Sequence, residues 1–549
     1  MLLKANNLEK CYGTKKILSV KKLEIFSDDK IGLIGMNGAG KSTLLKILFG
    51  DEKPDSGIVS HFCKISMIKQ NRENDGNPDG QKASLFNLKS SALKSGGEKT
   101  RLSIASALSK NSNLLFADEP TANLDIEGIK IFENELMAFK GAFVLVSHDR
   151  ELIEKTCNTI WEIDKGSLRI FSGKLSQFEE QKNNERENQS KEYIKYTKKK
   201  HELESALNEI KTHAAKMSHI PKGIGSKEAR VSFLKAEHSI KKVQNSASAV
   251  KKRISMLEEV EKPENITNIN IFMGPSESVG GKIMVSANNF SFGFNNKSLF
   301  NNVSFSIKTG RRTVIMGPNG CGKSTLASLI LKNSMGFKTD GLKTHPKIKA
   351  GLFSQESETI DISKTPLENM KFVSSKKESE LRTILACLLF SKEDIFKPAS
   401  LLSGGERARL KLAMLMASDL NTIILDEPTN YIDFYTSKAL EKLILKYSGA
   451  VIIITHDIAF AKNVGENFIF IKNGKVEMFE GTLNQYETKE KPAKSNQNLS
   501  LEKTIIEMEL SNLSSKIQNA SGSEKDQLQK RIDETIKKYI KIKELLKNV

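Results

Sequence analysis

The sequence predicts an α/β protein with two P-loop domains, joined by a long α-helical hairpin and followed by a C-terminal helical extension. Three observations predict this class. A glycine-rich motif that ends in Gly-Lys-Ser-Thr occurs twice, beginning at Gly35 and at Gly317. Short β-rich runs alternate with helical stretches around each copy. A long segment rich in lysine, glutamate, alanine and leucine separates the two copies.

The chain repeats itself at constant spacing. The glycine-rich motifs, GMNGAGKST and GPNGCGKST, lie 282 residues apart (317 − 35). Three later motifs recur 308 residues apart (403 − 95): SGGEKTRL at Ser95 and SGGERARL at Ser403, then ADEPT and LDEPT, then SHD and THD. Repetition in the same order predicts two homologous domains, which we place at residues 1–180 and 283–488.

Within each domain, apolar β-rich runs precede the motifs. IGLIG, NLLFAD and FVLVSH in the first domain match RTVIMG, NTIILD and VIIITH in the second, with helical stretches between them. Such alternation predicts βαβ units, and therefore a largely parallel sheet with helices on its faces.

Residues 181–282 form a separate segment, for which we expect a helical hairpin. The stretches 180–216 and 227–261 contain no proline or glycine, and the breakers between them are Pro221, Gly223 and Gly225. At ~1.5 Å per residue, arms of ~35 residues would each reach roughly 50 Å. We expect a second helical hairpin in the extension at 489–549, where apolar residues recur at helical spacing.

Positive charge is concentrated in this linker. The stretch from Lys195 to Arg253 contains fifteen Lys and Arg residues and five acidic residues. Its excess of ten positive charges compares with a net charge of +19 for the whole chain. A solvated spacer needs no such bias, whereas neutralising a phosphate backbone does. The charge therefore favours a polyanionic partner.

Composition argues against membrane and secreted classes. The longest apolar runs, such as VIII at Val451, are too short to span a bilayer. The N-terminus, MLLKANNLEK, lacks the segments of a secretory signal. The five cysteines lie far apart, in no zinc or disulfide spacing. We therefore expect a cytoplasmic protein.

Each glycine-rich motif follows a strand and opens a helix, as a phosphate-binding loop does. Glycines let backbone N–H groups close around phosphate oxygens, and the helix N-terminus adds positive potential. The lysine should reach the β- and γ-phosphates, and the serine should ligate Mg²⁺. The expected nucleotide contacts in these loops are Gly35, Asn37, Gly38, Gly40, Lys41, Ser42 and Thr43, then Gly317, Asn319, Gly320, Gly322, Lys323, Ser324 and Thr325.

Two Asp-Glu pairs end later apolar strands. Asp118 and Asp426 stand where a carboxylate can hold Mg²⁺ together with Ser42 or Ser324. The next residues, Glu119 and Glu427, are placed to polarise the attacking water as general bases. His148 and His456 follow a third strand and are candidates for contact with the γ-phosphate. The competing interpretation is structural, with the acids as helix caps and the histidines as core residues.

This motif set resembles that of the ABC ATPase superfamily, across nearly all of both repeats. The resemblance implies two ABC-type domains stacked head to tail around two ATP molecules. It implies that loop 35–43 faces Ser403, Gly404, Gly405 and Glu406, and that loop 317–325 faces Ser95, Gly96, Gly97 and Glu98. It also assigns Gln70 and Gln355 to Mg²⁺ and water, and Tyr12 and Phe294 to adenine. Departures such as Lys94 before SGGE and TANLD at Thr121 leave both catalytic glutamates in place.

Tandem ABC domains, a cationic helical linker and no membrane segment together resemble the ABC-F proteins. That resemblance implies a monomer whose two domains form an intramolecular dimer, with no membrane subunit. The implied partner is the bacterial 70S ribosome, where the linker would enter the tRNA exit site and reach P-site tRNA and 23S rRNA of the peptidyl transferase centre. The candidate RNA contacts are Lys216, His219, Lys222, Lys227 and Arg230.

The first domain is shorter than the second between two motifs. From Gln70 to Ser95 is 25 residues, against 48 from Gln355 to Ser403. Housekeeping ABC-F factors often insert an arm there. A first domain without that arm, an extended linker and a C-terminal extension resemble the antibiotic-resistance branch, which protects ribosomes against lincosamide, pleuromutilin and streptogramin A drugs.

Three alternatives stay open at this stage. The chain could be a housekeeping ABC-F translation factor. A tandem ATPase subunit of an importer would need membrane subunits and a short connector, whereas this connector is long. A DNA-repair or chromosome-type ABC ATPase would split one head around a very long coiled coil, a feature that the sequence lacks.

Overall fold

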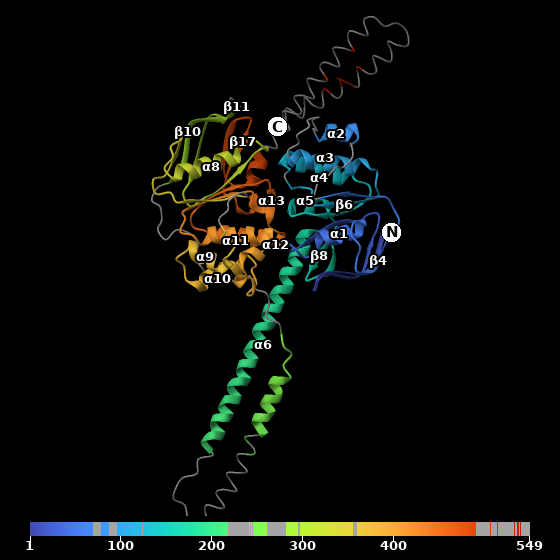
Figure 1. Cartoon of the computed structure of the whole chain (residues 1–549), viewed down its shortest axis with the longest axis vertical. Helices are drawn as coiled ribbons and strands as arrows, with labels where there is room; N and C mark the ends of the chain where they lie inside the picture. Colours follow the sequence, from blue (N-terminus) through green and yellow to red (C-terminus); the bar gives the residue numbers. More distant parts are fainter. Residues whose placement is uncertain are drawn as a thin grey trace, which may run out of the picture. The chain divides into compact units, whose positions relative to one another are not determined.

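The computed structural model describes residues 1–69, 78–86, 96–122, 124–217, 245–260, 282–294, 297–354 and 360–489, and single positions elsewhere. It is an α/β protein with two P-loop sheets and a long helix, α6, between them in the sequence (Figure 1). The chain forms two compact units. One contains both P-loop halves, and the other consists mainly of residues 170–268.

The first half contains one nine-stranded sheet, ordered β4-β1-β2-β9-β8-β3-β7-β6-β5. Strands β3, β7, β6 and β5 pair in parallel, as expected from the βαβ pattern. Its elements are β1 (Leu3–Tyr12), β2 (Lys15–Ile25), β3 (Lys30–Gly35), α1 (Lys41–Phe49), β4 (Ser56–His61), β5 (Ile65–Ile68), α2 (Gly80–Leu85), α3 (Gly96–Ser109), β6 (Leu114–Asp118), α4 (Ile126–Ala138), β7 (Ala142–Val146), α5 (Arg150–Thr156), β8 (Thr159–Asp164) and β9 (Ser167–Ser172).

The second half contains a six-stranded sheet, β14-β15-β16-β12-β17-β18, and an antiparallel sheet, β11-β10-β13. Its elements are β10 (Ile283–Phe294), β11 (Lys297–Lys308), β12 (Arg312–Met316), α8 (Lys323–Ser334), β13 (Leu342–Thr344), β14 (Ala350–Phe353), α9 (Pro366–Val373), α10 (Glu378–Cys387), the 3₁₀ turns Asp394–Phe396, Ala399–Leu401 and Pro428–Tyr431, α11 (Gly404–Ala417), β15 (Thr422–Asp426), α12 (Phe434–Lys446), β16 (Ala450–Ile454), α13 (Ile458–Val464), β17 (Asn467–Lys472) and β18 (Lys475–Glu480).

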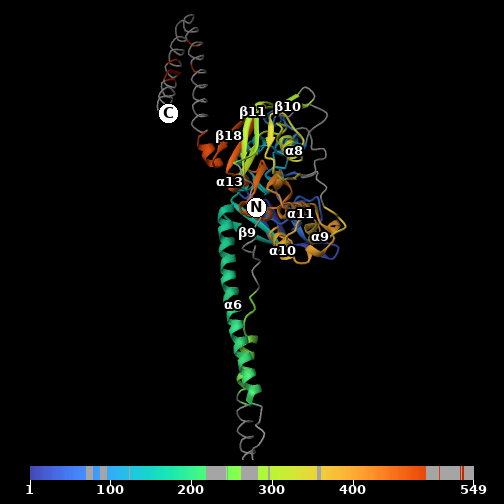
Figure 2. The same ribbon diagram turned by 90° about the vertical axis from the view of Figure 1, so that its left-hand side faces the viewer.

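The second half is itself divided into two parts. Figures 1 and 2 show β10, β11 and α8 gathered in one part, and α9, α10 and α11 in another. The central strands β12, β15 and β16 are buried along almost their whole length, because they are covered on both faces. Motif residues that follow such strands are consequently held by rigid backbone.

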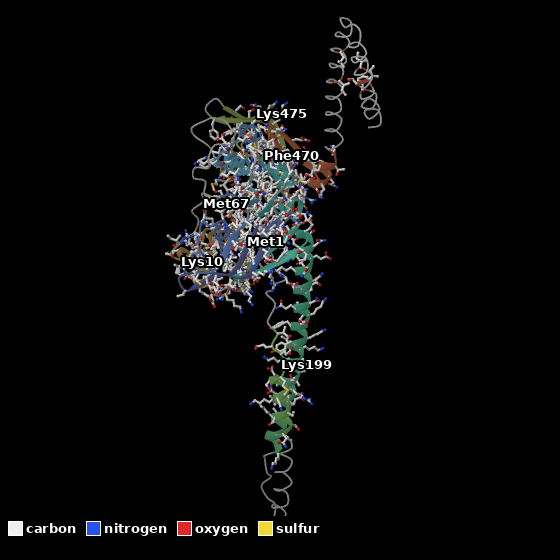
Figure 3. The ribbon with its side chains drawn as sticks, turned by 90° about the vertical axis from the view of Figure 1, so that its right-hand side faces the viewer. Met1, Lys10, Met67, Lys199, Phe470 and Lys475 are labelled. Atoms are coloured by element: carbon white, nitrogen blue, oxygen red, sulfur yellow. The ribbon has the colours of Figure 1, made fainter. Side chains whose placement is uncertain are left out.

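The linker begins with one long helix, α6 (Leu175–Met217). The sequence predicts a helix from about residue 180, and α6 begins five residues earlier, at Leu175. Leu175 and Phe178 are buried there. Along α6 the side chains, Lys199 among them, extend outward from the helix (Figure 3). Residues 245–255 are helical, as the second arm requires. The bend between the arms and nearly all of the extension at 489–549 lie outside the described residues.

Candidate nucleotide-binding sites

Two phosphate loops occupy equivalent positions in the halves. We call the first site A (loop Gly35–Thr43, with Glu119) and the second site B (loop Gly317–Thr325, with Glu427). Gly40 and Gly322 cap the loop helices α1 and α8 with φ of 100° and 102°, a left-handed conformation that favours glycine. A Cβ at Gly322 would lie 2.9 Å from the Phe300 ring, so space as well as conformation requires glycine there.

The loop lysines are buried and point back at their own loops. Lys41 Nζ donates to the Gly35 carbonyl at 2.8 Å and to the Met36 carbonyl at 3.1 Å. Lys323 Nζ donates to the Gly317 carbonyl at 2.8 Å and to that of Pro318 at 2.9 Å. Burial lowers the pKa of Lys41, against the opposing effect of nearby acids. A buried cation on a loop of N–H donors suits a polyanion.

A serine and an aspartate meet at each expected metal position. Ser42 Oγ donates to Asp118 Oδ1 at 3.2 Å in site A. Burial raises the pKa of both Asp118 and Asp426, and hydrogen bonds from Ser42 and Ser324 oppose that rise. Asp426 Oδ1 is buried without a hydrogen-bond partner among the described residues. Hydroxyl and carboxylate oxygens, one of them without a hydrogen-bond partner, are suitable ligands for Mg²⁺. The residues that would hold the ion are Ser42 with Asp118 and Ser324 with Asp426.

The glutamate of each site lies close to the histidine that was predicted as a candidate for contact with the γ-phosphate. His148 Nε2 lies 2.9 Å from Glu119 Oε1 in site A, and His456 Nε2 lies 3.5 Å from Glu427 Oε1 in site B. Both glutamates have positive φ, 48° and 47°, which is unusual for a residue with a side chain. Their backbone N–H groups donate to the ends of β7 and β16, at 3.0 and 2.9 Å, and so fix the turn.

Site B is strongly desolvated. Burial raises the pKa of Glu427 to about 8, with a smaller opposing contribution from Lys323. Burial lowers the pKa of His456 to about 4, and Lys323 acts in the same direction. Both shifts favour the neutral forms, as expected for groups removed from water. A cation at Asp426 would favour the ionised form of the neighbouring Glu427, which is the form that a general base needs.

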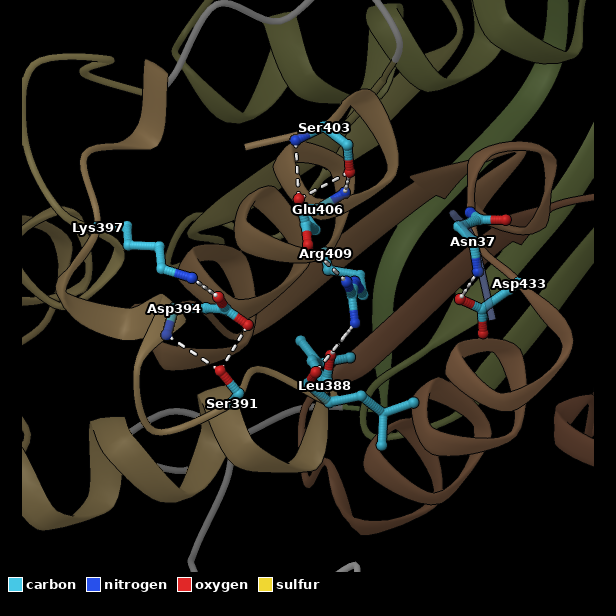
Figure 4. Close-up of polar contacts among 10 residues, drawn as sticks. Asn37, Leu388, Ser391, Asp394, Lys397, Ser403, Glu406, Arg409 and Asp433 are labelled. Carbon is cyan, nitrogen blue, oxygen red and sulfur yellow. Dashed lines mark hydrogen bonds and ion pairs between the residues drawn. The ribbon is translucent and has the colours of Figure 1, made fainter. Parts of the chain in front are cut away.

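The SGGE motif of the second half begins α11. Ser403 and Glu406 form a capping box: Ser403 Oγ accepts from the Glu406 N–H at 3.3 Å, and Glu406 Oε2 accepts from the Ser403 N–H at 2.8 Å (Figure 4). Gly404 and Gly405 form the first turn of this helix. In the first half, Gly96, Gly97 and Glu98 are the first residues of α3.

The two predicted adenine-stacking residues are both exposed. Tyr12 ends β1 with 51% of its surface accessible, and its hydroxyl donates to Glu52 Oε1 at 2.6 Å. Phe294 ends β10 with 57% accessible and meets Phe292 edge to face, the ring centroids 5.1 Å apart. Each therefore offers an aromatic surface to a ligand.

Seven predicted residues cannot be placed in this way. Gln70, Gln355, Ser95, His219, Lys222, Lys227 and Arg230 lie outside the described residues. Lys216 lies in helix α6.

Comparison with known proteins agrees with this geometry. A family model described as ABC transporter matches residues 18–87 and 300–430. The erythromycin resistance ATP-binding protein MsrA of Staphylococcus epidermidis is 32% identical, over 84% of this chain and 96% of that protein. ABC transporter F family member 5 of Arabidopsis thaliana is 29% identical, over 88% of this chain and 77% of that protein.

The chain belongs to the ABC-F family. A further ABC-F relative, the ribosome protection protein VmlR of Bacillus subtilis, is 28% identical over 82% of this chain and 83% of that protein. ATP-binding protein Uup of Buchnera aphidicola is 30% identical over 86% of this chain and 82% of that protein. ABC domains bind ATP, and tandem ABC domains imply ATP hydrolysis.

Solved structures confirm the ABC fold. The archaeal ribosome recycling factor aABCE1, solved with the stalk protein aP1, has a TM-score of 0.58 at 17% identity, covering 88% of this chain and 92% of that one. An RNase-L inhibitor has a TM-score of 0.57 at 18% identity, covering 87% and 91%. Within the described ranges of this ABC-F chain, no helix has the length and apolar character needed to cross a bilayer.

Contacts between the two ABC halves were missed by sequence reasoning. The backbone N–H of Asn37, in loop A, donates to Asp433 Oδ2 of the second half at 3.0 Å (Figure 4). Arg150, at the start of α5, reaches Glu441 Oε1 at 2.8 Å and Ser437 Oγ at 3.2 Å on α12. One available signal was a mismatch between the repeats, since SHD is followed by Arg150 where THD is followed by Ile458.

Proposed function

We propose that this ABC-F protein is an ATP-hydrolysing factor that binds the bacterial 70S ribosome and protects it from antibiotics. It would enter the tRNA exit site, and its linker would remodel the peptidyl transferase region next to P-site tRNA and 23S rRNA. The drugs that it would counter are lincosamides, pleuromutilins and streptogramin A. The proposal places it in the cytoplasm as a monomer with an intramolecular ABC dimer and no membrane subunit.

The single observation that carries the proposal is the combination of two equipped ATP sites with a cationic linker. Residues 195–217 contain six basic and three acidic residues, and residues 218–253 contain nine basic and two acidic residues. Earlier in α6, residues 175–194 carry five acids and three bases. Positive charge thus rises along the linker, as expected for a segment whose distal part meets RNA.

The proposed roles follow the geometry of the sites. Glu119 and Glu427 polarise the attacking water, and His148 and His456, which lie beside these glutamates, orient them and face the γ-phosphate. The loop lysines bind phosphate. Bound Mg²⁺ supplies charge neutralisation for the phosphates, held by Ser42 with Asp118 and by Ser324 with Asp426. The linker boundaries at 181 and 282 are part of this proposal.

The names of relatives support the resistance assignment. MsrA is named as an erythromycin resistance protein and VmlR as a ribosome protection protein. The second candidate function is a housekeeping ABC-F factor, because Uup is related at a similar level of identity. The short segment between 70 and 95 favours the resistance assignment.

Ribosome binding is tested with an ATP-trapped variant. Glu119→Gln/Glu427→Gln should bind ATP without hydrolysing it, because an amide cannot accept the proton of the attacking water. We expect this variant to co-sediment with 70S ribosomes in ATP. The matched control, Lys41→Ala/Lys323→Ala, should remain unbound because it lacks the phosphate-binding lysines. Equal behaviour of the two proteins, bound or unbound, would contradict nucleotide-driven ribosome binding.

Antibiotic protection is tested separately in a susceptible bacterial host. Expression of the unmodified protein should raise the inhibitory concentration of at least one of the three drug classes, and the Glu→Gln double variant should not. If ribosomes are bound while susceptibility to every ribosomal drug is unchanged, the housekeeping function is the correct one.

A further inference from the structure

An arginine follows the SGGE motif at the same position in both halves, but the two arginine side chains have different partners. In the second half, Arg409 Nη1 donates to the carbonyls of Leu388 at 3.3 Å and Leu389 at 3.1 Å (Figure 4). Its guanidinium also lies 5.2 Å from the centroid of the Phe390 ring. These residues follow the C-terminal end of α10, so Arg409 satisfies carbonyls near a helix terminus.

In the first half, the equivalent residue is Arg101, 308 positions earlier. Its Nη2 donates to Asp125 Oδ1 at 2.7 Å. Asp125 in turn begins α4, by accepting the N–H of Gly128 at 3.0 Å. Only 9% of the Asp125 side chain is exposed, so water and salt screen this ion pair weakly. Burial opposes ionisation of Asp125, but the Gly128 amide and Arg101 outweigh it and lower its pKa.

The difference in chain length accounts for the difference in partners. Helix α10 and residues 388–390 lie in the 48-residue segment between Gln355 and Ser403. The equivalent segment of the first half has 25 residues. The carbonyl groups that bind Arg409 belong to the 48-residue segment of the second half. In the first half, where this segment is shorter, Arg101 pairs with the Asp125 carboxylate.

The aspartates that begin α4 and α12 consequently have different environments. Asp433, the equivalent of Asp125, accepts the N–H of Thr436 at 2.9 Å, as a helix cap. Its other oxygen accepts the N–H of Asn37, in the phosphate loop of site A. One aspartate thus binds an arginine of its own half, and the other reaches the phosphate loop of the opposite half.

Asp125 is also electrostatically coupled to site B. It raises the pKa of His456, and His456 lowers that of Asp125, although burial has the larger influence on both groups. A change in the charge or position of Asp125 should therefore change the pKa of His456, which lies beside Glu427.

We propose that Arg101 is a positioning residue that makes the two ATP sites unequal. Arg101 holds Asp125 within the first half through their ion pair. The aspartate that is coupled to His456 of site B is therefore already paired with an arginine. Site A instead receives Asp433 on its phosphate loop. The inference rests on the ATPase part of the proposed function and is independent of ribosome binding.

The test measures each site separately in the full-length protein without ribosomes. Glu427→Gln leaves site A to hydrolyse ATP, and Glu119→Gln leaves site B. We expect kcat of the two single variants to differ by about threefold or more, because one charge-assisted hydrogen bond separates the sites. Adding Arg101→Met should move the ratio of the two kcat values toward one, by changing site B and leaving site A within about twofold. Arg101→Lys should preserve the original ratio.

Nucleotide binding provides a second readout if either glutamine variant stops both sites. Tyr12→Trp reports binding at site A and Phe294→Trp at site B, against the constant signal of the buried Trp161. Arg101→Met should change the ATP affinity at Phe294→Trp only. If Arg101→Met fails to fold, Asp125→Asn replaces it, because an amide keeps the helix cap and loses the charge.

Three outcomes would overturn the proposal: equal sites in the unmodified protein, an equal effect of Arg101→Met on both sites, or no effect at either. A protein that fails to bind ribosomes but meets these expectations would contradict the proposed ribosomal function alone.

Discussion

At the scale of single residues, the most unusual chemistry lies between the two ABC halves. Asp149 and Asp457 follow the predicted histidines and are both partly buried. Each begins a short helix by accepting a backbone N–H. Burial raises the pKa of both carboxyls, and the charge of Asp149 raises that of Asp457 further. Arg150 lies beside them and pairs with Glu441, another buried acid.

Asp457→Asn should stabilise the protein increasingly as the pH rises. A carboxyl whose pKa is raised in the folded state binds a proton there that the unfolded chain releases. Its contribution to stability therefore falls from about pH 4, the ordinary value, to about pH 7, the raised one. Urea unfolding midpoints of the variant and the parent should coincide near pH 4 and diverge by pH 8. A constant difference at all pH values would contradict the raised pKa.

Arg150→Ala should destabilise the protein by about 3 kcal/mol, because it leaves the Glu441 carboxylate buried without its cation. Urea unfolding at pH 7 measures this. Lys155→Ala is a matched control on the same helix: Lys155 is 43% exposed, and its loss should cost less than about 1 kcal/mol. Equal costs for the two variants would mean that the Arg150 contact is not formed.

The sequence motifs predicted which residues gather at each site, but they did not predict the side-chain partners of those residues. The Asp-Glu pairs, the loop lysines and the histidines lie together as expected. The different partners of Arg101 and Arg409 could not be foreseen, because both follow the same SGGE letters. What separates them is the length of a segment elsewhere in the chain.

At the scale of elements, apolar runs predicted strands well. IGLIG, NLLFAD and FVLVSH form β3, β6 and β7, and their counterparts form β12, β15 and β16. Helix α6 was predicted at 180–216 and spans Leu175–Met217. Helices α9 and α10 were not predicted individually, because they are short and carry no functional motif. Helix α9 nevertheless has a clear start signal, with Thr365 as the N-cap, Pro366 next and Glu368 completing a capping box.

Thr365→Ala should lower the free energy of unfolding by about 1 kcal/mol, since it removes the side-chain acceptor of the Glu368 N–H. Thr365→Ser, which retains the hydroxyl, should cost less than half as much. Chemical denaturation of the three proteins gives the comparison. If alanine and serine are equivalent, the capping box does not stabilise this helix.

At the scale of the whole molecule, we propose that the ATP sites and the linker have separate tasks. The ABC halves bind ATP, and residues 195–253 of the linker carry a net charge of +10 in a chain whose net charge is +19. Only the distal part of the linker is strongly basic, so charge reversals along α6 should differ in effect according to position.

Lys198→Glu/Lys199→Glu should weaken retention of the ATP-trapped protein on ribosomes and flatten its salt dependence, because two phosphate contacts are lost. Both lysines are exposed, so the fold should tolerate the change. Arg186→Glu/Lys191→Glu alters the charge equally in the earlier part of α6 and should have a smaller effect. Co-sedimentation across a salt series compares them, and equal loss for both pairs would contradict an RNA-facing distal linker.

The central claim is that ATP binding directs the cationic linker into the RNA of the peptidyl transferase region. The most direct measurement is a cryo-EM map of Glu119→Gln/Glu427→Gln on bacterial 70S ribosomes in ATP. We expect density for the protein in the tRNA exit site, with the linker beside P-site tRNA and 23S rRNA. An empty exit site, or a linker that points away from RNA, would contradict it.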